Sequence, residues 1–158
     1  MVTGNNEVKQ TKKLENVEDL DIWQKVHVIT IDVLKSVKAY PISEWSGLAQ
    51  RTKNISIDIP VLIERGFKRR NFREKLEYYL KASEALDELK YLLKIADQLG
   101  YTKKTNPLYP QIEETAAMFT GLIKAMEKRT MGLPPRGREV LNNDLPVDPV
   151  AEISSPDA

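Results

Sequence analysis

The longest amphipathic pattern in the chain, residues 71–99, limits the possible folds most. Its apolar side chains recur at intervals of three and four residues, as on one face of an α-helix. Asn71 is a typical N-cap, Glu74 follows three residues later as in a capping box, and Gly100 is a typical terminator. A helix of about 28 residues is roughly 42 Å long, so it predicts partner helices of similar length. The predicted buried face is Phe72, Leu76, Tyr79, Leu80, Ser83, Leu86, Leu89, Leu93, Ala96 and Leu99.

Two further helices are predicted, one near the start of the chain and one after residue 106. The first runs from a cap at Asn16 to about Tyr40, where Pro41 stops it. The last begins near Pro107 or Pro110, since proline suits a first helical turn, and runs to about residue 130.

The segment between Trp45 and Gly66 is ambiguous between a helix and a strand because it is rich in β-branched residues. Pro60 would deny a central strand one of its ladder hydrogen bonds, so we predict a helix that is kinked or loosened near Ser56. Gly66 is the predicted left-handed terminator. The predicted buried face is Trp45, Leu48, Thr52, Ile55, Ile59 and Leu62.

Four such helices joined by short turns predict an all-α, antiparallel up-and-down four-helix bundle over residues 16–130. Residues 1–15 are predicted to be a disordered arm, and residues 131–158 a disordered, acidic, proline-rich tail. Two apolar runs, at 92–95 and 22–23, extend beyond a narrow helical seam and favour self-association into a homo-oligomer.

Composition excludes several classes of function. The chain of 158 residues has no cysteine, so it has no disulfide framework and no thiolate nucleophile. The first residues are polar, and no run approaches the ~18 apolar residues of a membrane helix. A cytoplasmic protein with no membrane partner is therefore expected.

No catalytic or metal site is expected, and neither is a cofactor. His27 is the only histidine, which is too few for a di-iron bundle, and the sequence shows no credible Ser-His-Asp set. The acids Glu84, Asp87 and Glu88 lack a histidine or cysteine partner, so they are interpreted as a solvated face, with Glu88 a candidate for a buried or interfacial ion pair.

One strongly basic stretch between the second and third predicted helices suggests a nucleic-acid-binding surface, because phosphate backbones are bound largely by lysine and arginine. It contains six cations in eleven residues, although the net charge of the whole chain is only +1. The stretch is also compatible with a turn that is charged only for solubility, whose cations pair with Glu74 and Glu77. Trp45, Tyr78 and Tyr101 are candidates for stacking on bases, or for core and subunit contacts. The candidate binding residues are Arg65, Lys68, Arg69, Arg70, Arg73 and Lys75.

Several motifs resemble a family of small four-helix-bundle proteins encoded by intervening sequences in large-subunit ribosomal RNA genes, to which the accessory variability proteins of diversity-generating retroelements are related. The matching segments lie between residues 17 and 129 and include "LDIWQK", "YPISEWSGLAQR", "SIDIPVLIERG" and "IEETAAMFTGLIKAM". The sequence departs from the family pattern at the end of the second helix, where Asp58, Leu62 and Arg65 replace serine, asparagine and glutamate.

The resemblance implies a homo-oligomer, typically a pentameric barrel with a basic surface. For the retroelement branch it also implies binding to RNA or DNA and a reverse transcriptase as partner. The hypothesis from sequence is thus a non-enzymatic nucleic-acid-binding accessory protein. The alternatives are an oligomeric scaffold for protein–protein interactions and, third, the substrate-binding helical half of a two-component toxin system.

Overall fold

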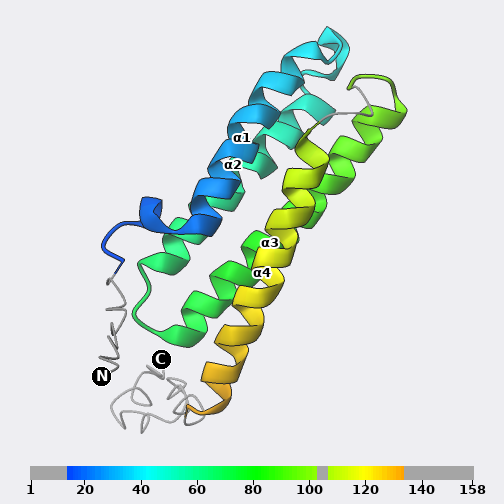
Figure 1. Ribbon diagram of the computed structural model, residues 1–158. Helices are drawn as coiled ribbons and strands as arrows, with labels where there is room; N and C mark the ends of the chain where they lie inside the picture. The colour runs from blue at the N-terminus through cyan, green and yellow to red at the C-terminus, as the bar shows by residue number, and fades with distance from the viewer. Residues whose placement is uncertain (1–13, 103–106, 134–158) are drawn as a thin grey trace, which may run out of the picture.

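The computed structural model describes residues 14–102 and 107–133, and these form a four-helix bundle without a strand in the described ranges. Figure 1 shows successive helices running in opposite directions, which confirms the predicted up-and-down order. Of the predicted arm and tail, residues 1–13 and 134–158 lie outside the described residues. The helices are α1 Asp21–Ser36, α2 Leu48–Phe67, α3 Phe72–Gln98 and α4 Leu108–Met131, with 3₁₀ turns at η1 Val17–Asp19, η2 Val37–Ala39 and η3 Ile42–Glu44.

The core forms where the apolar faces of all four helices meet. Its most deeply buried large side chains include Ile29 of α1, Ile63 of α2, Leu89 of α3 and Phe119 of α4. Three predicted core residues are exposed instead, and one of them is Leu80 on α3, which is 36% exposed. Trp45 is 55% exposed because α2 begins only at Leu48, and Leu99 is 56% exposed because it lies just beyond the end of α3.

The helix ends agree with the sequence in part. The side chain of Asn71 accepts hydrogen bonds from the backbone N–H groups of Arg73 and Glu74, so it caps α3 as predicted. Gly100 has a φ of 79°, as expected for a left-handed terminator. The prediction for Asn16 was wrong in its target: it caps η1, and α1 begins five residues later, at Asp21.

Pro60 lies inside α2, and the helix continues through it from Leu48 to Phe67. Proline has no N–H, so the carbonyl of Ser56, four residues earlier, lacks its usual donor. The hydroxyl of Thr30 on α1 lies 2.8 Å from that carbonyl oxygen and can donate to it, and both residues are buried. The loosening predicted at Ser56 is not seen as a break in the helix. The Thr30 hydroxyl also lies 3.0 Å from the carbonyl oxygen of Val26, and the shorter distance favours donation to Ser56.

The apolar runs that predicted self-association are mostly inside the bundle. Ile22, Leu92 and Leu93 are buried, and Ile95 is partly buried, because α1 and α3 each bury a face wider than the narrow seam assumed from sequence. Other apolar side chains are exposed on the outside, among them Val28 and Ile31 of α1. No helix in the described ranges is long and apolar enough to span a membrane.

Candidate nucleic-acid interface

The turn between α2 and α3 is short and carries three of the six candidate cations. α2 ends at Phe67 and α3 begins at Phe72, so only residues 68–71 connect the helices. The backbone N–H of Lys68 donates to Glu64 at 3.2 Å, and that of Arg69 donates to Gly66 at 3.1 Å. Because the backbone of this turn is held at both ends, Lys68, Arg69 and Arg70 project from a fixed position.

Gly66 makes the close approach of α2 and α3 possible. A Cβ atom added there would lie 2.9 Å from the Cβ of Tyr78, closer than real Cβ atoms come to other atoms. Gly66 is buried within α2, and Gly100 is the only described residue with a positive φ. The prediction that Gly66 ends α2 in a left-handed conformation was therefore wrong, and its role is to let Tyr78 of α3 pack against α2.

Arg69 is held against the aromatic ring of Tyr78. Its guanidinium carbon lies 5.0 Å from the ring centroid, and the guanidinium donates a 3.0 Å hydrogen bond to the Tyr78 hydroxyl. The ammonium group of Lys81, one turn further along α3, lies 5.5 Å from the same centroid. Tyr78 thus gathers two cations. A ring already in contact with two cations orients them rather than offering a free face to a base.

The remaining candidates differ in how free they are. Arg65 and Arg70 are exposed, and neither forms an ion pair with a carboxylate in the described ranges. Lys68 is also exposed but pairs with Glu64 at 2.8 Å. Arg73 is partly buried in the first turn of α3. The candidate cations therefore include one that is paired, Lys68, and two that have no carboxylate partner among the described residues, Arg65 and Arg70.

Lys75 lies with its side chain directed at the end of α2. Its ammonium group donates to the backbone oxygen of Phe67 at 3.2 Å and lies 5.5 Å from the centroid of the Phe67 ring. Partial burial lowers the pKa of Lys75, because it disfavours the charged form. The structure thus gives this predicted binding residue a capping role at the C-terminus of α2.

Sequence reasoning missed the contribution of α4 to this end of the bundle. The guanidinium carbon of Arg129 lies 5.4 Å from the centroid of the Phe72 ring, so the last turn of α4 lies against the first residue of α3. The up-and-down topology could have revealed this, because the end of α4 must return to the turn between α2 and α3. We call the following set the basic end: Arg65, Lys68, Arg69, Arg70, Arg73, Lys81 and Arg129.

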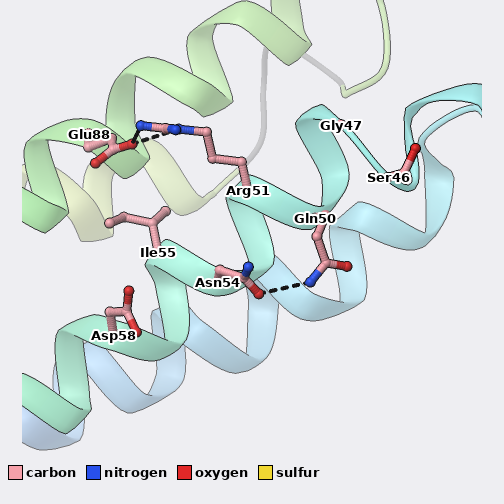
Figure 2. A pocket seen from close by; sticks show the side chains of 8 residues that line it. All are labelled: Ser46, Gly47, Gln50, Arg51, Asn54, Ile55, Asp58 and Glu88. Carbon is pink, nitrogen blue, oxygen red and sulfur yellow. Dashed lines mark hydrogen bonds and ion pairs between the residues drawn. The ribbon is translucent and has the colours of Figure 1, made fainter.

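A polar groove of about 420 Å³ lies between α2 and α3, away from the basic end. Figure 2 shows its two internal interactions: Arg51 pairs with Glu88, and Gln50 donates to Asn54 at 2.9 Å. The Nε–H of Arg51 donates to Glu88 at 2.8 Å, so Glu88 is an ion-pair partner as predicted, but the pair lies on the surface of the bundle and is not buried. Because the arginine is already paired, the groove offers no unmatched positive charge to an anion. Its lining is Ser46, Gly47, Gln50, Arg51, Asn54, Ile55, Asp58 and Glu88.

The described part of the chain contains no group of three metal-ligating side chains. His27, the histidine singled out by sequence, is exposed on α1 and stacks on Trp23 with ring centroids 5.0 Å apart. Glu84 and Asp87 are exposed on α3, as predicted for a solvated face.

The sequence model for the 23S rRNA-intervening sequence protein family matches residues 18–121, about two thirds of the chain. The chain belongs to this family. The match includes α1, α2, α3 and the first half of α4, so the turn that carries most of the basic end lies within the family region. Arg129 lies outside it. No curated protein matches the chain.

Proposed function

We propose that this member of the 23S rRNA-intervening sequence protein family is a non-enzymatic RNA-associated protein that contacts the phosphate backbone with its basic end. The observation that carries the proposal is the presence of exposed guanidinium groups without carboxylate partners in the described ranges, at Arg65 and Arg70, beside one held in place by Tyr78. Cations that neutralise phosphates release counterions, which is the main driving force for backbone binding. The compartment that we propose is the cytoplasm.

The fixed position of one guanidinium group supports phosphate binding over a role in solubility alone. A guanidinium that is already fixed by a hydrogen bond and a ring contact loses little further side-chain entropy when it binds a phosphate. Arg69 meets this condition through its contacts with Tyr78. The family description concerns ribosomal RNA, so RNA is the polyanion of the proposal, and DNA is a comparison in its test. The reverse transcriptase implied for the retroelement branch gains no support from the family match and is not part of the proposal.

The test is a binding titration with single-stranded RNA, double-stranded RNA and DNA of equal length. In one variant Arg65, Arg69 and Arg70 are changed together to Gln, which retains helix propensity while removing charge. We expect RNA affinity to fall at least tenfold.

The matched control removes the same charge at the opposite end of the bundle, by changing Lys35, Lys38 and Lys94 to Gln. These lysines are exposed and lie toward the ends of α1 and α3, away from the turn. Equal losses in the two triple variants, or no RNA binding at all, would overturn the proposal.

We also propose that the protein assembles into a homo-oligomer, a pentamer by the resemblance described above. Exposed apolar side chains on the outer faces of α1 and α2 support it: Val28 is 50% exposed, Ile31 is 38% exposed and Ile57 is 44% exposed. Light scattering at micromolar concentration should report several copies. Ile31→Glu should reduce the mass, whereas Leu99→Glu, which also places a charge on an exposed apolar position, should not. A stable monomer would remove this part of the proposal.

The same exposed apolar side chains favour one alternative function, an oligomeric scaffold that binds another protein. The two functions separate in the titration. An oligomer that binds none of the three nucleic acids would support the scaffold.

A further inference from the structure

Two hollows lie on adjacent sides of the bundle, and α1 borders both, because it packs against α2 on one side and α4 on the other. The first is a pocket of about 220 Å³ against α2, which we call the Trp45 surface. The second lies between the first half of α1 and α4, where two adjoining hollows of about 340 and 510 Å³ share Asp21 and Met118, and we call it the α4 groove. The lining of the Trp45 surface is Leu34, Val37, Lys38, Trp45, Ala49 and Lys53.

The Trp45 surface presents large apolar side chains to the solvent. Trp45 is 55% exposed, and Ile42, three residues earlier, is 81% exposed. The backbone N–H of Trp45 donates to the carbonyl of Ile42 at 3.1 Å, at the end of the 3₁₀ turn η3. Residues three apart in a 3₁₀ helix lie above one another, so both side chains project on the same side. Tryptophan is a frequent anchor of protein–protein interfaces, so this turn has the character of an anchor.

The α4 groove offers apolar contacts to such an anchor. Val28, which is 50% exposed, lines it on α1, and Leu14, which is 45% exposed, lines it next to the start of α1. Met118 and Leu122 of α4 are partly buried and form the opposite wall. The groove therefore has room for a tryptophan side chain and presents apolar groups for the ring to contact.

The two surfaces carry opposite charge. The charged residues that line the Trp45 surface are Lys38 and Lys53, and neither pairs with a carboxylate among the described residues. Three carboxylates and one lysine line the α4 groove, namely Asp19, Asp21, Glu114 and Lys25. Lys25 pairs with Glu114 at 3.0 Å, so the two aspartates supply the excess negative charge of the groove.

We propose that the Trp45 surface of one copy of this chain binds the α4 groove of a second copy. This rests on the proposed homo-oligomer and names the two faces that meet in it. Lys53 is partly buried at the surface and faces the aspartates of the groove, whereas Lys38 is exposed at the rim, where a charge adds little affinity. Because the two surfaces differ, each contact leaves one of each unused, and the contact repeats head to tail instead of stopping at a dimer.

The placement of the two surfaces favours a closed ring. Adjacent sides of a four-helix bundle face directions about 90° apart, which corresponds to a ring of roughly four or five copies. The surfaces lie about ten residues apart along α1, or roughly 15 Å, so the bundles must tilt against the axis of the ring for it to close.

The test uses two variants of the full chain that each place a carboxylate in one surface, Trp45→Glu and Val28→Glu. Light scattering at micromolar concentration should report a monomer for each variant alone. An equimolar mixture should form a dimer and nothing larger, because the Trp45 surface of the Val28→Glu chain and the groove of the Trp45→Glu chain are both intact. Formation of this dimer also shows that both variants are folded.

The matched control is Tyr91→Glu, which places the same charge at an exposed aromatic position on α3 that lines neither surface. It should retain the mass of the unaltered chain. An oligomer whose mass neither Trp45→Glu nor Val28→Glu changes would overturn the inference and leave the homo-oligomer standing.

Other results would also contradict the contact. An unaltered chain that stops at two copies, or variants that stay monomeric on mixing, would exclude a head-to-tail arrangement. If Trp45→Glu lost RNA affinity at an unchanged mass, Trp45 would be assigned to a base and not to a second copy. A monomeric unaltered chain would remove both the homo-oligomer and this inference.

Discussion

Replacing Thr30 by valine tests how the bundle accommodates a proline inside α2. The change removes the hydroxyl that donates to the carbonyl of Ser56 at 2.8 Å, and Pro60 has no N–H to replace it. A buried carbonyl without a donor costs about 1–3 kcal/mol. Valine restores some apolar contact, so we expect the free energy of unfolding to fall by about 1–2 kcal/mol.

The decisive comparison is the same change in a Pro60→Ala background. Alanine supplies an N–H at position 60, which can donate to Ser56 within the helix, so Thr30→Val should then cost less than about 0.5 kcal/mol. Urea unfolding at one fixed protein concentration measures both costs.

The control is Thr120→Val, which removes a hydroxyl that donates at 3.0 Å to the carbonyl of Ala116 on the surface of α4. The residue that normally donates to that carbonyl, at position 120, is not a proline, so no carbonyl loses its only donor. Its cost should be small and the same in both backgrounds. An equal cost of Thr30→Val with and without Pro60 would refute the role assigned to the hydroxyl.

Three other changes test single contacts. Gly66→Ala should lower the free energy of unfolding by about 1–2 kcal/mol, because the added Cβ would lie 2.9 Å from the Cβ of Tyr78. Gly121 has open space around it, so Gly121→Ala should raise the free energy of unfolding by up to about 1 kcal/mol. A gain in stability at both positions would contradict the close approach. Lys75→Met should lower the free energy of unfolding, measured in urea, by about 1 kcal/mol, because it removes the hydrogen bond to the end of α2. It should reduce RNA affinity less than the loss of an exposed arginine does. Burial raises the pKa of Tyr79 above its ordinary 10.0, so this tyrosine ionises in the unfolded state before it ionises in the folded state. The stability that it contributes is full below pH 10 and is lost as pH rises through the folded pKa. Phenolate absorbance and thermal unfolding at about pH 9–12 check this, and ionisation of every tyrosine before unfolding would contradict it.

The positions of the helices follow from local sequence signals. Asn71 and Gly100 were predicted correctly because a cap and a left-handed glycine act within a few residues of their own position. Gly66 was misread because the same residue type also permits close helix contact, and only the position of Tyr78 on a different helix decides between the two roles.

The candidate site could be predicted only as a region. The count of cations in the turn is visible in sequence, but the direction of each flexible side chain depends on tertiary neighbours. Lys75 turns to the end of α2, and Arg69 turns to Tyr78. Arg129 joins the site through the topology of the bundle, because it is more than fifty residues away along the chain.

The salt dependence of RNA binding tests the central claim most directly. The logarithm of affinity should fall linearly with the logarithm of salt concentration, with a slope of about −0.7 for each single-stranded phosphate that the protein neutralises. Removing the charges of Arg65, Arg69 and Arg70 should make that slope shallower by about 2, while the Lys35, Lys38 and Lys94 variant should retain the original slope. A slope that is the same in all three proteins would contradict the claim that the basic end binds the backbone.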